Sequence, residues 1–261
     1  MIINKNICPA SACYPGKPID TALILLHKNK PTDFCIEKWD FSNIQICPQH
    51  IGFISETTTN RIKSKYPTTQ FRLHANIRVN TTHRSFDAGF DLLDNLEYAT
   101  KIKNIQQQLN AKTYSYHAPM RHNKSWNEII TNVLTLQEFL GIPTALEGLY
   151  PNLNNPEDLW KDSIIAYNQI LKSDLFFALD LSHLNIAYEQ TDDFHKEKLI
   201  TLTKEMLQNK NCIEVHISSN DGKHDSHNAI DKHIWWIDLL NQTELSNDCV
   251  VFCESMQKNN S

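Results

Sequence analysis

Short runs of apolar, β-branched and aromatic residues recur along the chain, and longer segments in which apolar residues return every three or four positions separate them. The short runs have the length of strands, whereas the longer segments show the period of about 3.6 residues that is typical of amphipathic helices. Strands that alternate with helices indicate βαβ units and a parallel sheet. The segments predicted as strands are Ile3–Ala10, Asp33–Trp39, Gln70–Ile77, Thr113–Pro119, Pro143–Leu149, Leu175–Leu181, Cys212–Ser218 and Cys249–Ser255.

The helical pattern is clearest over Ser125–Leu140. There we expect Ser125 to cap the first turn and Gly141 to end the helix. Similar patterns predict further helices, over Glu157–Leu171, His195–Leu207 and Ile230–Leu240.

The number of strands and the length of the chain together suggest the fold. Eight strands with helices between them, in 261 residues, match the size of a closed (β/α)8 barrel. We therefore predict an α/β fold in which residues 1–261 form a single TIM-barrel domain, with the active site at the C-terminal ends of the strands. An open doubly wound sheet is the alternative, but it calls for a Gly-rich first turn, and the six glycines form none.

Composition limits the location and the partners of the protein. A formal net charge of −5 and a hydrophobic content of 41% are typical of a globular chain and argue against a broad basic surface for nucleic acid. No apolar run reaches the roughly 20 residues of a membrane span, and the first residues do not resemble a signal peptide. Seven cysteines without a repeated C-x-x-C spacing predict reduced thiols in a cytoplasmic protein.

One stretch of the sequence carries the densest set of candidate ligands. The apolar run that begins at Cys212 breaks at His216, and a polar loop that contains Asp225 and His227 follows. Side chains alternate along an extended segment, so the Asp-x-His step directs both side chains to the same side. Imidazole nitrogens combined with a carboxylate suit Zn²⁺, Mn²⁺ and Fe²⁺.

Other predicted strands also end in a histidine or a carboxylate, at the edge where a TIM barrel places its active site. Burying such a group at the end of an apolar strand is unfavourable unless something compensates it. A shared cluster of divalent cations, one to three per chain, is the simplest compensation. The candidate metal ligands are His74, His117, Glu147, Asp180, His183, His216, Asp225, His227 and Glu254.

Each candidate also has an interpretation that needs no metal. A single histidine at a strand end is more often a hydrogen-bonded core or rim residue than a ligand, and Asp180 has the position of an N-cap for the next helix. Glu37, in the predicted second strand, fits a salt bridge at the rim or a partner of a ligand. We expect His122, His224 and His233 to be solvated. The coincidence of nine candidates in strand register favours metal binding.

The series H…H…E…D-x-x-H…H…D-x-H…E resembles the xylose-isomerase-like TIM-barrel superfamily. This superfamily includes sugar isomerases and epimerases, endonuclease-IV-type AP endonucleases, and multinuclear non-haem iron oxidases that modify peptides. The resemblance covers nearly the whole chain and is strongest over Leu179–Asn185 and His216–His227. It implies three metal sites, and Glu147 would bridge the first two. Asp180, His216 and Glu254 would complete the first site, and His74 and His117 the second. The third site would consist of His183, Asp225 and His227.

Two departures from the superfamily pattern concern the substrate rim. Many relatives have Gly-x-Gly after the Asp-x-His step, where this chain continues with Asn228–Trp236. The residue after Glu147 is Gly148 rather than the frequent asparagine. The resemblance therefore does not identify the substrate.

The leading hypothesis is a sugar or hydroxy-carbonyl isomerase or epimerase that acts on a small polyhydroxylated molecule. A divalent metal polarises a carbonyl and acidifies the neighbouring C–H. We expect Glu147 and Glu254 to be the catalytic residues that remove and return the proton. The residues expected to contact substrate hydroxyls at the rim are Trp39, Asn76, Asn152 and Asn185.

Three alternatives stay open at the level of sequence. An endonuclease-IV-like phosphodiester hydrolase would use all nine ligands, but the acidic charge disfavours nucleic acid as a partner. An oxidase with two or three iron ions would use the same ligands on a peptide or a metabolite. A barrel that binds without catalysis would need no metal. The basic residues that leave room for nucleic acid are Arg72, Arg78, Arg84 and Arg121.

We expect protein purified under reducing conditions to hold tightly bound divalent metal, because so many ionisable groups cannot share a buried site without compensation. Elemental analysis of the reconstituted protein measures this content. A value below about half an equivalent per chain would contradict the whole ligand assignment.

Overall fold

Eight parallel strands form one sheet in the computed structural model, which describes residues 2–79, 85–121, 124–152, 155 and 157–258. The strands are β1 (Ile7–Pro9), β2 (Asn43–Ile46), β3 (Gln70–His74), β4 (Tyr114–His117), β5 (Thr144–Glu147), β6 (Phe177–Asp180), β7 (Cys212–Ile217) and β8 (Val250–Cys253). Neighbours in the order β1-β8-β7-β6-β5-β4-β3-β2 are hydrogen-bonded, and a parallel bridge between Ala10 and Gln45 brings the two edges together. The predicted (β/α)8 barrel is confirmed.

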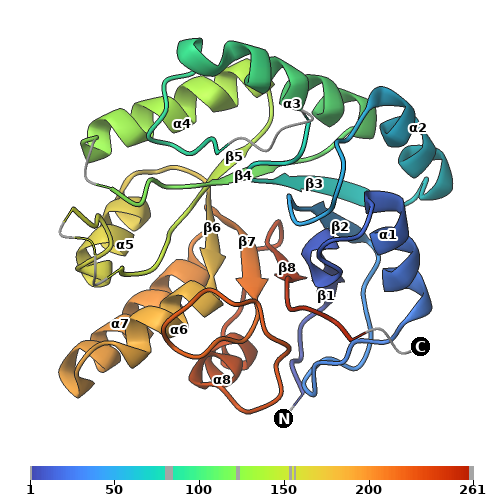
Figure 1. Cartoon of the computed structure of the whole chain (residues 1–261). Coiled ribbons are helices and arrows are strands. Elements are labelled where there is room, and N and C mark those ends of the chain that lie inside the picture. The colour runs from blue at the N-terminus through green and yellow to red at the C-terminus, as the bar shows by residue number, and fades with distance from the viewer. Residues whose placement is uncertain (1, 80–84, 122–123, 153–154, 156, 259–261) are drawn as a thin grey trace.

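The helices lie outside the strands and surround them (Figure 1). Their bounds are Ile19–Lys28 (α1), Glu56–Lys65 (α2), Leu96–Leu109 (α3), Trp126–Leu140 (α4), Ser163–Lys172 (α5), Leu181–Glu189 (α6), Asp193–Gln208 (α7) and Trp235–Gln242 (α8). Two short 3-10 turns, Ser11–Cys13 (η1) and Leu93–Asn95 (η2), precede α1 and α3. Within the described ranges, none of the helices combines the length and the apolar character that crossing a bilayer requires.

The central strands are short and buried along their whole length, as in other parallel sheets covered by helices. Strands β5 and β6 have four residues each, all of them buried. In both strands the ionisable residue comes last, Glu147 in β5 and Asp180 in β6. The apolar residues anchor each strand in the barrel wall, and the last residue places a carboxylate at the carboxyl edge.

The prediction of a second strand over Asp33–Trp39 is wrong. The segment is a loop with a turn in which the Ile36 backbone N–H donates to the carbonyl of Asp33, and the second strand is β2, which follows this loop. Ile36 is buried nevertheless. An apolar pattern reports burial, and over a short run it does not distinguish a buried loop from a strand. Glu37 therefore does not stand at the end of a strand.

Helix α4 begins and ends as predicted. The Ser125 hydroxyl accepts from the Glu128 backbone N–H, and the Glu128 carboxylate accepts in return from the Ser125 backbone N–H at 2.8 Å, which completes a capping box. Gly141 follows the last turn with a φ of 73°. A residue with a Cβ adopts this left-handed conformation only with strain, so glycine suits the stop.

The other three predicted helices begin at residues other than those expected, because the residues that precede their first turns were not recognised in the sequence. The Asp162 side chain accepts from the Ile165 backbone N–H, so α5 begins at Ser163 rather than at Glu157. Asp192 caps α7, which begins at Asp193. Helix α8 begins at Trp235, five residues after the predicted start.

The capping box predicts the effect of Ser125→Ala. The change removes the acceptor for the Glu128 N–H, and we expect a loss of about 1 kcal/mol of stability. Urea unfolding of the variant and the parent protein measures it. Ser64→Ala, at an exposed position inside α2, is the matched control and should leave stability unchanged or slightly higher. Equal unfolding midpoints for Ser125→Ala and the parent would contradict the role of the cap.

Candidate metal centre

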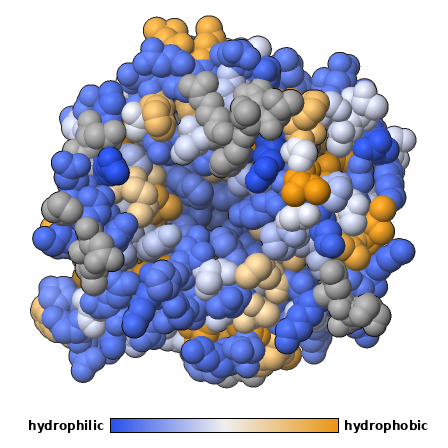
Figure 2. All heavy atoms as spheres, in the orientation of Figure 1, coloured by the Kyte–Doolittle hydropathy of each residue, from blue (hydrophilic) through white to orange (hydrophobic). Residues whose placement is uncertain are grey.

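The nine predicted ligands come together at the carboxyl edge of the barrel. Strands β3 to β6 each end with one of them, namely His74, His117, Glu147 and Asp180. A hydrophilic hollow lies near the centre of the face shown in Figure 2. A cavity of about 100 Å³ is lined by eight of the nine ligands and two neighbours: Pro48, Gln49, His74, His117, Glu147, Asp180, His183, Asp225, His227 and Glu254.

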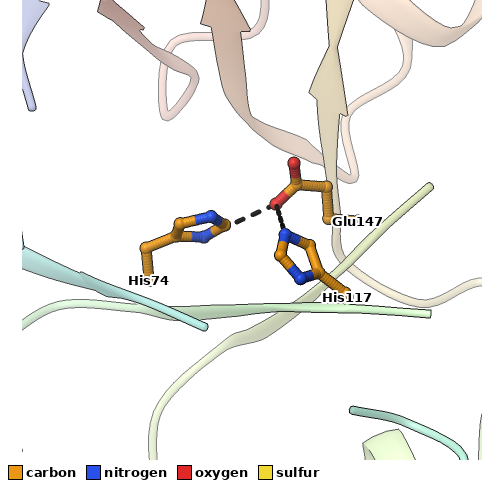
Figure 3. Close-up of side chains that lie close together, drawn as sticks. All are labelled: His74, His117 and Glu147. Atoms are coloured by element: carbon orange, nitrogen blue, oxygen red, sulfur yellow. Dashed lines mark ion pairs between the residues drawn. The ribbon is translucent and has the colours of Figure 1, made fainter. Parts of the chain in front are cut away.

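Figure 3 shows the first group of ligands, in which two imidazoles point at one carboxylate. The same Glu147 oxygen, Oε2, lies 3.5 Å from His74 Nδ1 and 3.7 Å from His117 Nε2. These ligand atoms lie within 4.8 Å of one another, which is close enough for one ion to contact all three after small adjustments. The group corresponds to one of the three sites that the resemblance implies.

A second group forms around the ninth ligand, His216. Its Nδ1 atom lies 3.3 Å from Glu147 Oε1 and 3.7 Å from Glu254 Oε1. The ligand atoms of Glu147, Asp180 and His216 again lie within 4.8 Å of one another, and so do those of His74, His216 and Glu254. His74 thus stands between two groups, and Glu147 belongs to two of them, as expected of a bridging ligand.

The third predicted site is arranged differently. Asp225 Oδ2 lies between two imidazoles, 3.3 Å from His183 Nε2 and 3.2 Å from His227 Nε2. The Nδ1 atom of His183 is 2.9 Å from the Gly148 carbonyl, which directs Nε2 into the cavity. Among the described residues, the groups with ligand atoms all within 4.8 Å do not include this trio. The three side chains are neighbours joined by ion pairs.

The loop that carries Asp225 and His227 is held in an unusual backbone conformation. His227 has a φ of 45°, a left-handed value that is uncommon for a residue with a Cβ. An antiparallel bridge between Ser219 and Asn228 and a hydrogen bond from the Met256 N–H to the His227 carbonyl, at 2.7 Å, keep it there. Local strain of this kind is often retained where a side chain must be aimed.

Several buried ligand atoms have no hydrogen-bond partner. These are Glu147 Oε2, His216 Nδ1, Asp225 Oδ1 and His227 Nδ1. An unpartnered buried polar atom is destabilising, and each of these atoms faces or flanks the cavity described above. The donor set of imidazole and carboxylate fits a divalent metal such as Zn²⁺, Mn²⁺ or Fe²⁺.

Without a metal, the carboxylates in the cavity shift the pKa values of the neighbouring histidines. Burial alone would lower the pKa of the His183 imidazole, but Asp180 and Asp225 outweigh burial and raise it to about 10. Burial likewise opposes the effect of Asp225 and Glu254, which raise the pKa of His227 to about 9. Both imidazoles therefore carry protons at pH 7, and a metal that binds this trio has to displace them.

The ligands of the first two groups differ among themselves. Burial would lower the pKa of His216, but Glu147 and Glu254 outweigh burial and raise it well above its usual value. Burial lowers the pKa of His74 to about 3, since Glu147 compensates only in part, so His74 presents a free lone pair. Burial would raise the pKa of Glu147, but His216, His74 and His117 hold it well below its usual range. Burial raises the pKa of Glu254 to about 7, against the opposing effect of two histidines.

Asp180 lies in the centre, whereas two of the histidines expected to be solvated lie outside it. Asp180 is both cap and ligand candidate, because Oδ1 accepts from the backbone of Ser182 at 2.6 Å while Oδ2 lies 3.5 Å from His183 Nε2. His224 and His233 are exposed and paired with nearby aspartates, as expected of residues outside the centre. His122 lies outside the described residues.

The expected hydroxyl contacts are only partly placed at the mouth. Trp39 is not there, because it lies beside the residues that precede β1, at the opposite end of the barrel. That assignment followed from the wrong second strand and is corrected here. Asn185 uses its amide in bonds to Asn220 and Trp235. Asn76 accepts from a backbone N–H at 2.5 Å. Asn152 lines a groove at the mouth.

A buried carboxylate beneath the centre, Glu214, was not predicted. It stands two residues before His216 in β7, so both side chains face the barrel interior. Its carboxylate lies 3.3 Å from His216 Nε2, on the side of the ring away from Glu147. The Glu-x-His spacing in a strand was the signal that could have revealed it.

Comparisons with known proteins concern the fold. No protein-family model and no curated protein matches the sequence. A D-tagatose 3-epimerase-like protein is 14% identical with a TM-score of 0.64, over 97% of this chain and 91% of its own. An AP endonuclease, family 2, from Brucella melitensis is 13% identical with a TM-score of 0.64, over 97% and 94%. These likenesses show a shared barrel fold. The IOLI protein with a binding zinc atom has this barrel too, at 13% identity and a TM-score of 0.57, over 97% and 90%.

The arrangement of the third trio predicts the effect of Asp225→Ala and His227→Ala. Each change removes a ligand at the end of the cavity, so we expect the protein to lose one metal ion while the barrel stays folded. Elemental analysis together with circular dichroism measures both properties.

The same loop offers a matched control. Asp221 and His224 form an exposed ion pair at 2.8 Å outside the cavity, so Asp221→Ala and His224→Ala should leave the metal content unchanged. Equal metal contents in the Asp225→Ala variant and in these controls would show that the third trio does not hold a metal.

Proposed function

We propose that the protein is a metal-dependent isomerase or epimerase of a small polyhydroxylated carbonyl compound. The observation that carries the proposal is the approach of two buried carboxylates, Glu147 and Glu254, to one atom of His216, at 3.3 and 3.7 Å. One carboxylate comes from β5 and the other from the residue after β8. They reach a common point from different parts of the barrel wall, which suits proton removal and return at one carbon.

A groove beside the centre supports a small, polar substrate. It has a volume of about 550 Å³ and is lined by Tyr150, Pro151, Asn152, Gln190, Lys223, His224 and Asp225. Asp225 lines the metal cavity as well, so the groove adjoins the centre at this residue. Hydroxyl, amide and ammonium groups around the groove offer the hydrogen bonds that a polyhydroxylated molecule requires.

The chemistry needs one metal held by one set of ligands: Glu147, Asp180, His216 and Glu254. A divalent cation bound there supplies the Lewis acidity that polarises a carbonyl and acidifies the adjacent C–H. In an epimerisation Glu147 removes the proton from one face of the substrate, and Glu254 returns a proton to the other face. The two side chains are only 1% and 2% exposed, so water has little access to the proton in transit.

The names of fold neighbours agree with this proposal. Two of them are a D-tagatose 3-epimerase-like protein, at a TM-score of 0.64, and a D-allulose 3-epimerase from Methylomonas, at 0.54. Their identities of 14% and 12% carry the fold alone, so the substrate of this chain rests on its own residues.

A phosphodiester hydrolase of the AP endonuclease type is the second candidate. The observation in its favour is the trio His183, Asp225 and His227, which closes the cavity and which a sugar isomerase of this fold does not need. The AP endonuclease, family 2, described above is also similar in fold to this chain.

The basic residues expected to contact a nucleic acid weaken this second candidate. Arg72 is buried inside the barrel, where it donates to the Ile213 carbonyl at 2.7 Å. Arg78 donates to the Pro48 carbonyl, also at 2.7 Å. Arg84 lies outside the described residues. Of the three expected arginines that the structure describes, Arg72 and Arg78 are held by these bonds, and Arg121 is exposed and forms an antiparallel backbone bridge with Asp158.

The proposal is tested with the metal-loaded protein in D2O and a panel of ketopentoses and ketohexoses. We expect deuterium to enter at the carbon beside the carbonyl, observed by proton NMR, together with the epimer. Glu147→Gln should lower the exchange rate by about 10²- to 10⁴-fold, because it removes a proton acceptor and a ligand.

Glu138→Gln, at an exposed position on α4, is the control and should exchange as fast as the parent protein. A panel without any exchange that depends on Glu147, combined with Glu147-dependent cleavage of DNA at an abasic-site analogue, would replace the isomerase proposal with the hydrolase.

A further inference from the structure

Glu214 lies one layer below the candidate metal centre, in the interior of the barrel. It is fully buried, and its contacts come from strands on other sides of the barrel. Arg72 in β3 lies 3.4 Å from Oε1, and Thr113, just before β4, donates to the same oxygen. Gln45 in β2 donates to Oε2 at 3.0 Å. A carboxylate with this many donors is held in one position.

The two ring nitrogens of His216 have different surroundings. Nδ1 faces Glu147 and Glu254 and has no hydrogen-bond partner. Nε2 faces the other way and lies 3.3 Å from Glu214 Oε2. A neutral imidazole carries one N–H and one lone pair, so the proton on Nε2 is the condition for a lone pair on Nδ1.

Gln45 competes for the same nitrogen. Its side-chain nitrogen lies 2.8 Å from His216 Nε2 as well as 3.0 Å from Glu214 Oε2. An amide N–H donated to Nε2 would place the imidazole proton on Nδ1 and block metal binding. The carboxylate of Glu214 favours the tautomer with the proton on Nε2, because an ionised carboxylate can only accept a hydrogen bond from that nitrogen.

We propose that Glu214 is a positioning residue that accepts the Nε2–H of His216 and thereby keeps Nδ1 available to a metal. The inference rests on the metal centre proposed above and adds the group that sets the tautomer of one ligand. Carboxylates that hold a ligating histidine in this way fix the direction of the ring and raise its basicity.

The contacts of Arg72 explain how a buried Glu214 carboxylate keeps one oxygen directed at His216. The guanidinium donates to the Ile213 carbonyl at 2.7 Å and to the Asp248 carbonyl at 3.0 Å, so it is fixed at the base of the layer. Arg72 and Thr113 both contact Oε1. Oε2 is therefore the oxygen that faces His216, which shares it with Gln45.

Glu214→Gln tests the inference, because it keeps the size of the side chain but gives it an amide that can donate to Nε2. We expect the affinity for zinc, measured by titration against a chelator, to fall by about 10- to 100-fold. Tyr98→Phe is the control for a lost buried hydrogen bond away from the lumen, since the Tyr98 hydroxyl donates to the Ile77 carbonyl at 2.9 Å. It should bind zinc as the parent does.

A second measurement needs no variant and reports the tautomer itself. In the zinc-loaded parent protein with ¹⁵N-labelled histidine, we expect the His216 signal to show a proton on Nε2 and none on Nδ1. The opposite tautomer, or equal zinc affinity in folded Glu214→Gln and the parent, overturns the role of Glu214 and leaves the metal centre intact. A parent protein that binds no zinc, manganese or iron overturns the metal centre and this inference together.

Discussion

Repulsion among buried carboxylates is the constraint on which the rest of the structure depends. Glu147, Asp180 and Glu254 are each no more than 2% exposed, and Asp225 joins them in one small cavity. Water cannot screen charges in such a place, so their interaction is far stronger than at a surface. Positive charge has to be supplied, either as protons on the neighbouring imidazoles or as metal ions. The five histidines among the candidates make both states accessible to the same folded chain.

The interior of the barrel is organised to meet this constraint. The lumen of a TIM barrel is usually filled by layers of branched apolar side chains, whereas here a polar layer with Arg72 and Glu214 lies below the ligands. The apolar packing lies instead between the strands and the helices, around large buried residues such as Trp160, Trp236 and Phe71. Hydrophobic stabilisation of the outer shell thus allows the lumen to serve binding. The division explains how so many ionisable groups coexist with a stable barrel.

The sequence predicted the features of this structure that depend on a few consecutive residues. An apolar run that ends in Glu147 or Asp180 shows both the strand and the side chain it presents, so the barrel and the set of ligand candidates followed from one pattern. Strand β2 did not follow, because its four residues include the polar Gln45, whose partners are 169 and 171 positions away. The division of the ligands among sites was equally out of reach. His74 lies near both Glu147 and Glu254, and only the packed barrel shows that.

Gln45 also has a place in the closure of the barrel. The parallel bridge between Ala10 and Gln45 is the contact that joins the first strand to the second, and the side chain of Gln45 reaches the carboxylate and the imidazole beneath the ligands. The seam between the first and second strands therefore carries a donor that touches the ligand layer. The wall of the barrel and the layer beneath the ligands thus share one residue, so a change that weakens this seam also alters the hydrogen bonding of Glu214 and His216.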